Sequence, residues 1–174
     1  MKKFELTSET KINIFGKKLF RIKALISFGD VEAGETGGWV EKEGNVNQSG
    51  DAWVSGDAEV SGDARVFGNA MVSGNARVFG DAEVSGNAEV SGDARVFGDA
   101  MVSGNADYTT IHGFGTQFRT TTFFRCKDKK VRVACGCFFG TIPEFREQVK
   151  NTRKGKIAEE YLMIADLMEK HFEK

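Results

Sequence analysis

Hydrophobic and polar positions in the central part of the chain recur with a period of six residues. Glycine stands at every sixth position from Gly44 to Gly104, eleven times without interruption. Asp or Asn follows each glycine, then usually Ala, a variable residue and an aliphatic residue, which is Val nine times from Val54 to Val102. Ala and Val lie two residues apart, so both point inward while the residue between them points outward. This strict period predicts a parallel β-helix with three hexads per coil.

Coils of three hexads place each residue beside the one eighteen positions later. Glu59 then lies next to Arg77, which gives an opposite-charge pair, whereas Arg77 beside Arg95 brings two like charges together. The hexad pattern resembles the left-handed β-helix of the hexapeptide-repeat proteins. Eleven hexads at three per coil give a solenoid of fewer than four coils.

The two ends of the chain follow other patterns. Residues 11–15 (KINIF) and 17–25 (KKLFRIKAL) predict a β-hairpin, which we expect to cap the open edge of the solenoid. After Asn105 the period is lost, and residues 120–140 predict a second hairpin. Residues 141–144 (TIPE) form a capping box that begins a helix, and a second helix follows Gly155.

These patterns define a fold class and three segments. We expect a mainly β protein: a left-handed parallel β-helix of hexapeptide repeats with an N-terminal β cap and a small C-terminal ββαα unit. The predicted segments are 1–43 for the hairpin and cap, 44–109 for the β-helix, and 110–174 for the C-terminal unit.

The second hairpin carries the predicted ligand site. A two-residue loop near Asp128 pairs Arg125 with Arg132 and Phe124 with Val133, whereas a three-residue loop would mix valines and arginines on one face. The opposite face then gathers cations around an aromatic ring, a combination suited to an anionic ligand. A solvated face, or one docked on the acidic β-helix, is the alternative. The predicted binding residues are Arg119, Thr121, Phe123, Arg125, Lys127, Lys130 and Arg132.

Three phenylalanines interrupt the serines that otherwise follow the repeat valines. Phe67, Phe79 and Phe97 each follow an inward Val, so alternation directs them outward. Outward aromatic residues indicate a covered face. We expect an oligomer contact or a docked terminal segment there, with a platform for ligand stacking as the alternative.

Charge and composition limit the class of partner. Residues 1–38 have a net charge of +2, residues 39–106 of −7 and residues 107–174 of +4. The acidic solenoid argues against long nucleic acid and leaves a small anionic ligand as the expected partner. The sequence contains no candidate membrane span or secretory leader, and three cysteines give no disulfide framework. We therefore expect a cytoplasmic protein without a membrane partner.

Catalytic and metal-binding signals are weak. Hexapeptide-repeat acyltransferases generally carry a general-base His on a coil, and the coils here have none. His112, just past the last hexad, is the weak catalytic candidate. Cys126, Cys135 and Cys137 lack a fourth ligand at metal-binding spacing, so we expect no metal and no cofactor. The stacked column of Asp63, Asp81 and Asp99 is explained as turn residues.

The Gly-Gly-Trp-Val entry at 37–40 and the Gly-Asp-Ala-Trp corner at 50–53 carry a further resemblance. With the tail at 121–149, they make the chain similar to phage and prophage hexapeptide-repeat proteins. The resemblance implies a trimeric accessory protein in the bacterial host cytoplasm, with no catalytic residue to carry over. We expect a non-enzymatic protein that sequesters a small anionic ligand, with a nucleotide signal of host immunity as a candidate. An acyltransferase, or an oligomeric scaffold that binds a host protein, remains the alternative.

Overall fold

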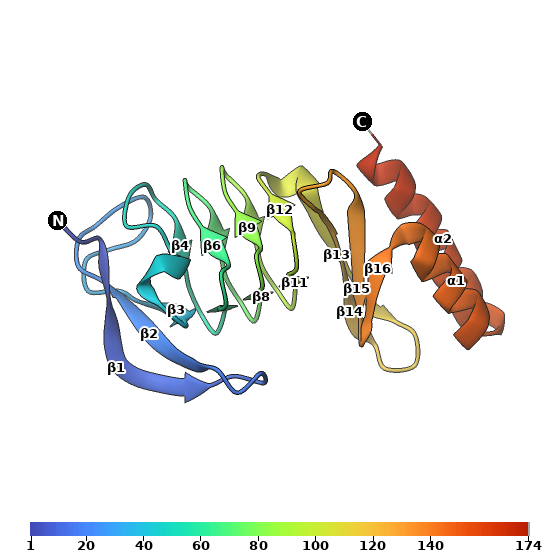
Figure 1. Ribbon diagram of the computed structural model, residues 1–174, viewed down its shortest axis with the longest axis horizontal. Helices are drawn as coiled ribbons and strands as arrows, with labels where there is room; N and C mark the ends of the chain where they lie inside the picture. The colour runs from blue at the N-terminus through green and yellow to red at the C-terminus, as the bar shows by residue number, and fades with distance from the viewer. Residues whose placement is uncertain (174) are drawn as a thin grey trace. The chain divides into compact units, whose positions relative to one another are not determined.

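The computed structural model describes residues 1–173, and it divides the chain into two compact units, 1–105 and 106–174 (Figure 1). The first unit holds the N-terminal hairpin and the solenoid, and the second holds a sheet and two helices. Within the described residues, no helix is both long and apolar enough to cross a membrane.

Short parallel strands build the solenoid. Strands of two residues stack on partners eighteen residues away, as in the pairing of Glu59 with Arg77 and of Arg65 with Glu83. The predicted three hexads per coil and the predicted parallel β-helix are thereby confirmed. The like-charged pair of Arg77 and Arg95 is also present. The strands are β4 (Trp53–Val54), β5 (Glu59–Val60), β6 (Arg65–Val66), β7 (Met71–Val72), β8 (Arg77–Val78), β9 (Glu83–Val84), β10 (Glu89–Val90), β11 (Arg95–Val96) and β12 (Met101–Val102).

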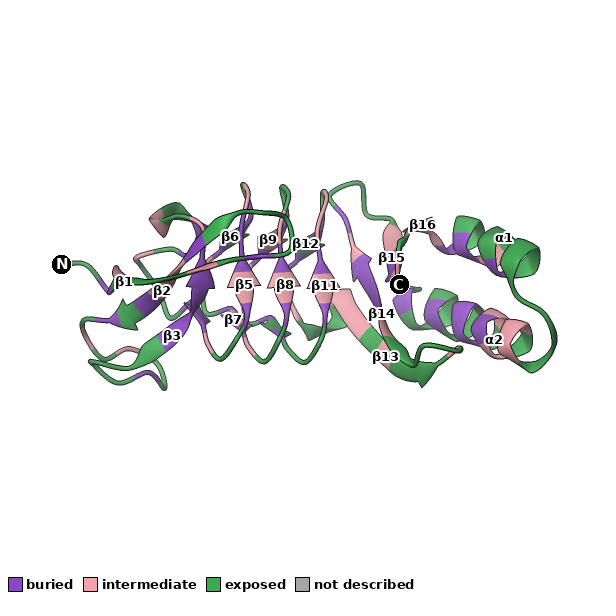
Figure 2. Cartoon of the chain, turned by 90° about the horizontal axis from the view of Figure 1, so that it is seen from below, coloured by how far each residue is buried: buried purple, intermediate pink, exposed green. Residues whose placement is uncertain are grey.

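The alanines and valines of the hexads form the core of the solenoid. Ala and Val are fully buried in every coil, from Ala52 and Val54 to Val102, whereas the residue between them is half-buried or exposed, except Trp53 (Figure 2). The corner glycines have positive φ angles, and a Cβ on Gly80 would lie 3.0 Å from the backbone nitrogen of Gly98 in the next coil. Backbone conformation and stacking therefore both require glycine at these corners.

The N-terminal hairpin extends one face of the solenoid. Strands β1 (Phe4–Ile12) and β2 (Lys18–Ala24) pair in antiparallel fashion, and β3 (Thr36–Val40) joins β2 to β5. The resulting sheet has the order β1-β2-β3-β5-β8-β11. A short 3₁₀ helix, η1 (Glu43–Asn45), leads into the first coil. The predicted hairpin is present, but its first strand is Phe4–Ile12 and not residues 11–15, of which 13–15 lie in the turn.

Polar groups from the cap satisfy the backbone of the first coil. Each coil donates its N–H groups to the coil that follows, so the carbonyls of the first coil have no preceding coil to bind. Lys3 Nζ donates to the carbonyls of Gly50 (3.1 Å) and Ala52 (2.7 Å). Asn45 Nδ2 donates to the carbonyls of Gly62 (3.1 Å) and Ala64 (2.8 Å). The cap therefore ends the solenoid without leaving these acceptors unpaired.

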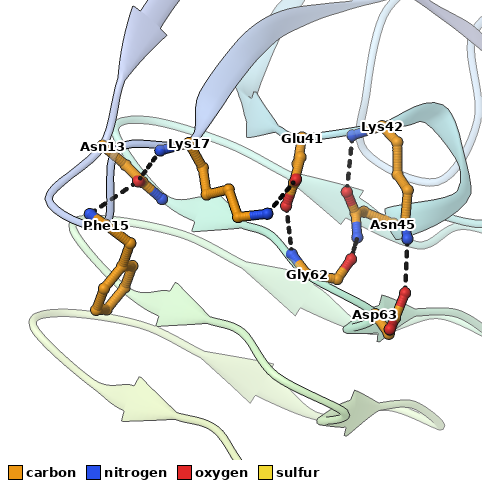
Figure 3. Close-up of polar contacts among 8 residues, drawn as sticks. All are labelled: Asn13, Phe15, Lys17, Glu41, Lys42, Asn45, Gly62 and Asp63. Carbon is orange, nitrogen blue, oxygen red and sulfur yellow. Dashed lines mark hydrogen bonds and ion pairs between the residues drawn. The ribbon is translucent and has the colours of Figure 1, made fainter.

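An ion-pair network holds the hairpin tip against the same coil (Figure 3). Lys17 Nζ lies 3.1 Å from Glu41 Oε1, and Glu41 Oε2 accepts a hydrogen bond from the Gly62 backbone N–H at 2.7 Å. That backbone bond, followed by the Lys17 contact, lowers the pKa of Glu41 below its ordinary value. Asn13 Oδ1 accepts from the N–H groups of Phe15 and Lys17, which fixes the turn itself.

Lys3 makes the stability of the cap depend on pH. Burial lowers its pKa from 10.5 to about 8, against the opposing attraction of Asp51. The unfolded chain therefore binds more protons than the folded chain between those values, so the free energy of unfolding rises with pH between about 8 and 10.5. We expect a rise of up to about 3 kcal/mol.

Urea unfolding across this pH range checks the prediction. Lys3→Met should remove the rise, and Lys2→Met, which alters an exposed residue, should retain it. Equal slopes for the wild type and Lys3→Met would show that Lys3 is not the responsible group.

The second unit is a four-stranded sheet with two helices packed against one face. The helices and the sheet share a core of Phe123, Val133, Phe145, Tyr161 and Met168, among others. The two predicted strands, two helices and capping box are present, and the structure adds a strand on either side, giving the order β13-β14-β15-β16. The elements are η2 (Asn105–Asp107), β13 (Tyr108–Phe114), β14 (Arg119–Arg125), β15 (Val131–Cys135), β16 (Phe138–Thr141), α1 (Ile142–Thr152) and α2 (Gly155–Phe172).

The predicted register of the second hairpin is wrong by one residue. Phe123 pairs with Val133 and Arg125 with Val131, so the connection is one residue longer than predicted. Lys129 occupies the left-handed region with φ +65° and donates its N–H to the carbonyl of Cys126. A three-residue loop with a left-handed third position is a common hairpin connection. Valine and arginine therefore do share a face, although the predicted two-residue loop would keep them apart.

Candidate functional site

The predicted binding face is the face that the helices cover. Thr121, Phe123 and Arg125 do lie on one side of β14, as expected, but Phe123 is fully buried and its ring lies 6.3 Å from that of Phe145 in α1. Thr121 is buried and donates to Cys135 Sγ at 3.1 Å. Phe123 therefore cannot stack on a ligand at the surface, and this part of the predicted site is wrong.

The predicted cations are divided among different places. Arg119 lies at the start of β14 and Arg125 at its end. Arg132 of β15 lies opposite Phe124 and binds Asp128 Oδ2 at 2.7 Å. Lys127 is exposed in the hairpin loop. The structure brings Arg125 and Lys130 together in one groove and places Arg119 in another pocket.

The groove at the hairpin-loop end of the sheet has a volume of about 490 Å³, within the range of small-molecule sites. Apolar groups form much of its surface, and charged side chains come from the hairpin and from the end of α2. Its lining residues are Arg125, Lys129, Lys130, Val131, Thr141, Ile142, Pro143, Glu169, Phe172 and Glu173.

Arg125 has a structural role in this groove. Its Nε lies 3.2 Å from Asp107 Oδ1, its Nη2 donates to the carbonyl of Phe172 at 3.0 Å, and its guanidinium carbon lies 5.4 Å from the centroid of the Phe172 ring. These contacts tie the C-terminal end of α2 to the sheet. Arg125 therefore shapes the groove, while its charge is already partly neutralised by Asp107.

The other acidic groups of the groove are also paired. Glu169 binds Arg146 Nη2 at 2.7 Å, and Glu173 binds Lys170 Nζ at 2.8 Å. By contrast, Lys129 and Lys130 have no carboxylate partner within 4.0 Å among residues 1–173. The positive charge of these two lysines remains available to a ligand.

Asp128 fixes the loop that carries the two lysines. Its Oδ1 accepts a hydrogen bond from the Lys130 N–H at 2.9 Å, and its Oδ2 binds Arg132. The backbone bond and then the Arg132 bond lower the pKa of Asp128, so it stays ionised at neutral pH. The loop conformation is thereby held independently of any ligand.

A second, smaller pocket of about 100 Å³ lies at the other end of the sheet. It contains Arg119, one of the predicted binding residues, together with Arg153 of the connection between the helices. The lining residues are Phe114, Gly115, Thr116, Gln117, Arg119, Cys135, Gly136, Cys137, Arg153 and Tyr161.

The outward phenylalanines of the solenoid are in two environments. Phe79 and Phe97 stack with centroids 4.7 Å apart, and Phe15 of the hairpin tip packs on Phe79 at 4.8 Å. A docked terminal segment, one of the two expected coverings, is therefore present at Phe79. Phe67 instead lines a groove of about 330 Å³, with Arg65 5.8 Å from its ring centroid. Whether these residues contact other subunits stays a prediction.

The catalytic and metal-binding candidates differ in their relation to the groove and the smaller pocket. His112 and Cys126 line neither, whereas Cys135 and Cys137 line the smaller pocket. His112 is exposed on β13, with its Nδ1 3.0 Å from Thr120 Oγ1 in the same hairpin. Cys126 is buried, Cys135 is half-buried and Cys137 is exposed. Residues 1–173 contain no group of three or more His, Cys, Asp or Glu side chains arranged to hold a metal ion.

Comparison with known proteins bears on the fold. The family model of the YdcK β-solenoid repeat matches residues 64–80. This match covers one stretch of the repeat and, with the observed coils, supports a β-helix repeat protein. The comparison with curated proteins gives no match.

Proposed function

We propose that the protein is a non-enzymatic binding protein that holds a small anionic ligand in the groove formed by Lys129, Lys130 and Phe172. The observation that carries the proposal is the combination of an apolar surface with two lysines that form no ion pair within 4.0 Å among residues 1–173. A ligand with an anionic group and an apolar or aromatic body matches both features.

A nucleotide is one member of this ligand class. Its phosphates would lie near the lysines, and its base would pack on the apolar groups Val131, Ile142 and Phe172. The resemblance to phage and prophage hexapeptide-repeat proteins supports an accessory role in a bacterial host, in which the protein would sequester a nucleotide signal. Assembly as a trimer, with Phe67, Phe79 and Phe97 at or near the contacts, is part of the same proposal.

A binding experiment on the whole protein tests the proposal. The purified protein is incubated with a mixture of cyclic and linear nucleotides and acyl-coenzyme A compounds, washed and heat-denatured, and the released molecules are identified by mass spectrometry. We expect an intact anionic ligand in stoichiometric amount. The Lys129→Glu/Lys130→Glu variant should bind that ligand at least about tenfold more weakly, because two attractions become repulsions.

The matched control makes the same charge change in the other unit. Lys18→Glu/Lys23→Glu alters two exposed lysines of β2 and should leave ligand affinity unchanged. Release of a chemically changed molecule would contradict the non-enzymatic function and favour the acyltransferase alternative. Retention of nothing would contradict ligand binding and favour the scaffold. Equal binding by the wild type and Lys129→Glu/Lys130→Glu would contradict the assignment of the ligand to this groove.

A further inference from the structure

The pocket that contains Arg119 and Arg153 is positively charged, and no acidic side chain of residues 1–173 lines it. Arg153 Nη1 donates to the carbonyl of Thr152 at 3.2 Å, and neither guanidinium has a carboxylate within 4.0 Å in the described part of the chain. Two guanidinium groups at one small cavity favour a bound oxyanion, because each can donate two parallel hydrogen bonds.

The remaining lining groups are compatible with an anion. Thr116 and Tyr161 supply hydroxyl groups, and Gln117 supplies an amide. Burial raises the pKa of Tyr161 above its ordinary value, and the neighbouring Cys135 raises it further. The tyrosine therefore keeps its proton at neutral pH and adds no negative charge to the pocket.

The backbone holds the pocket in shape. Gly115 has a φ angle of +75°, and a Cβ added there would collide with the hydroxyl of Tyr161. Gly136, with φ +59°, forms the turn between β15 and β16, and a Cβ there would lie 3.2 Å from Arg119 Nη1. The Gly115 turn thus approaches Tyr161 more closely than a Cβ would allow, and the Gly136 turn lies close to Arg119. The Thr121 hydroxyl donates a hydrogen bond to Sγ of Cys135, one of the lining residues.

The size of the cavity limits the ligand. Its volume of about 100 Å³ corresponds to the space of roughly three water molecules. A tetrahedral oxyanion or the terminal phosphoryl group of a larger molecule fits this space, whereas a whole nucleotide does not.

We propose that this pocket is a binding site for a tetrahedral oxyanion of the phosphate class, held by Arg119 and Arg153. The site is separate from the groove lined by Lys129 and Lys130, because Arg119 and Arg125 stand at opposite ends of β14. It does not depend on the proposed function of that groove.

Calorimetric titration of the whole protein with inorganic phosphate, and separately with sulfate, tests the site. We expect saturable binding of one anion per chain with a dissociation constant below about 10 mM. Arg119→Gln/Arg153→Gln should weaken binding at least about tenfold, because both charged donors are lost. Circular dichroism of the two helices checks that each variant is folded.

Two control variants test whether the pocket itself binds the anion. Lys154→Gln/Lys156→Gln removes two neighbouring cations that do not line the pocket, and it should leave phosphate affinity unchanged. Lys129→Glu/Lys130→Glu should also leave it unchanged, which distinguishes this site from the groove. The absence of saturable phosphate and sulfate binding, or equal binding by the wild type and a folded Arg119→Gln/Arg153→Gln variant, would overturn the proposal.

Discussion

Phe123→Ala is expected to lower the free energy of unfolding of the C-terminal unit by about 3–5 kcal/mol. The side chain is fully buried between β14 and the helices and contacts Phe145, so its removal leaves a cavity in a packed core. Both α-helices belong to this unit, so the helical circular dichroism signal during urea unfolding reports its stability. The tryptophans Trp39 and Trp53 lie in the first unit, and their fluorescence follows that unit separately.

The control for this prediction is Leu167→Ala, which removes an exposed side chain from α2 of the same unit. It should cost less than about 1 kcal/mol, seen by the same circular dichroism signal. If Phe123→Ala unfolded at the same urea concentration as the wild type, Phe123 would be a surface residue, as the two-residue loop requires, and the pairing of Phe123 with Val133 would be wrong.

Asn45→Ala is expected to destabilise the first unit by about 2–4 kcal/mol. Asn45 is fully buried, and its amide supplies hydrogen bonds to two backbone carbonyls of the first coil and accepts one from the Lys42 N–H. Alanine would leave these groups buried without partners, at a cost of about 1–3 kcal/mol for each one that water cannot reach. The transition followed by tryptophan fluorescence should move to lower urea concentration.

Asn47→Ala is the matched control for the cap. Asn47 is exposed, and its side-chain oxygen accepts local hydrogen bonds from the N–H and hydroxyl of Ser49. We expect a loss of at most about 1 kcal/mol. Equal losses for the two asparagines would contradict the role assigned to Asn45 in ending the solenoid.

The solenoid could be predicted because every hexad repeats the same pattern of residues. Gly, Ala and Val recur at fixed spacing, so the corner, the inward positions and the stacking distance of eighteen residues follow from one another. For the N-terminal cap, the sequence predicted a hairpin but not the hydrogen bonds that it makes to the first coil. That Lys3 and Asn45 end the backbone ladder depends on contacts with residues more than fifteen positions away, which no local pattern records.

The hairpin register could not be predicted from the alternation of residues alone. Alternation favoured the two-residue loop, which separates valines from arginines. The deciding conformation is the left-handed Lys129, where a glycine would have signalled a three-residue loop. A shift of one residue in the register changes which residues of β14 and β15 share a face, because side chains alternate along strands. The basic character of this hairpin end was visible in the sequence, with Arg125 and Lys130 both in the groove.

The walls of both C-terminal sites come from elements distant in sequence. Phe172 reaches the groove from the end of α2, and Arg153 reaches the small pocket from the helix connection. The capping box at 141–144 predicted where α1 begins, but not that this end borders the groove. The packing of helices on the sheet creates these sites, so their outlines required the structure.

The ligand groove is tested most directly by locating a bound anion on the protein. Backbone amide chemical shifts of the isotope-labelled whole chain are followed during titration with the nucleotide that the mass-spectrometric experiment identifies. We predict that the largest saturable shift changes fall on Lys129, Lys130, Val131 and Phe172. Changes confined to other residues, such as those of the solenoid coils around Phe67, would contradict the assignment of ligand binding to this groove.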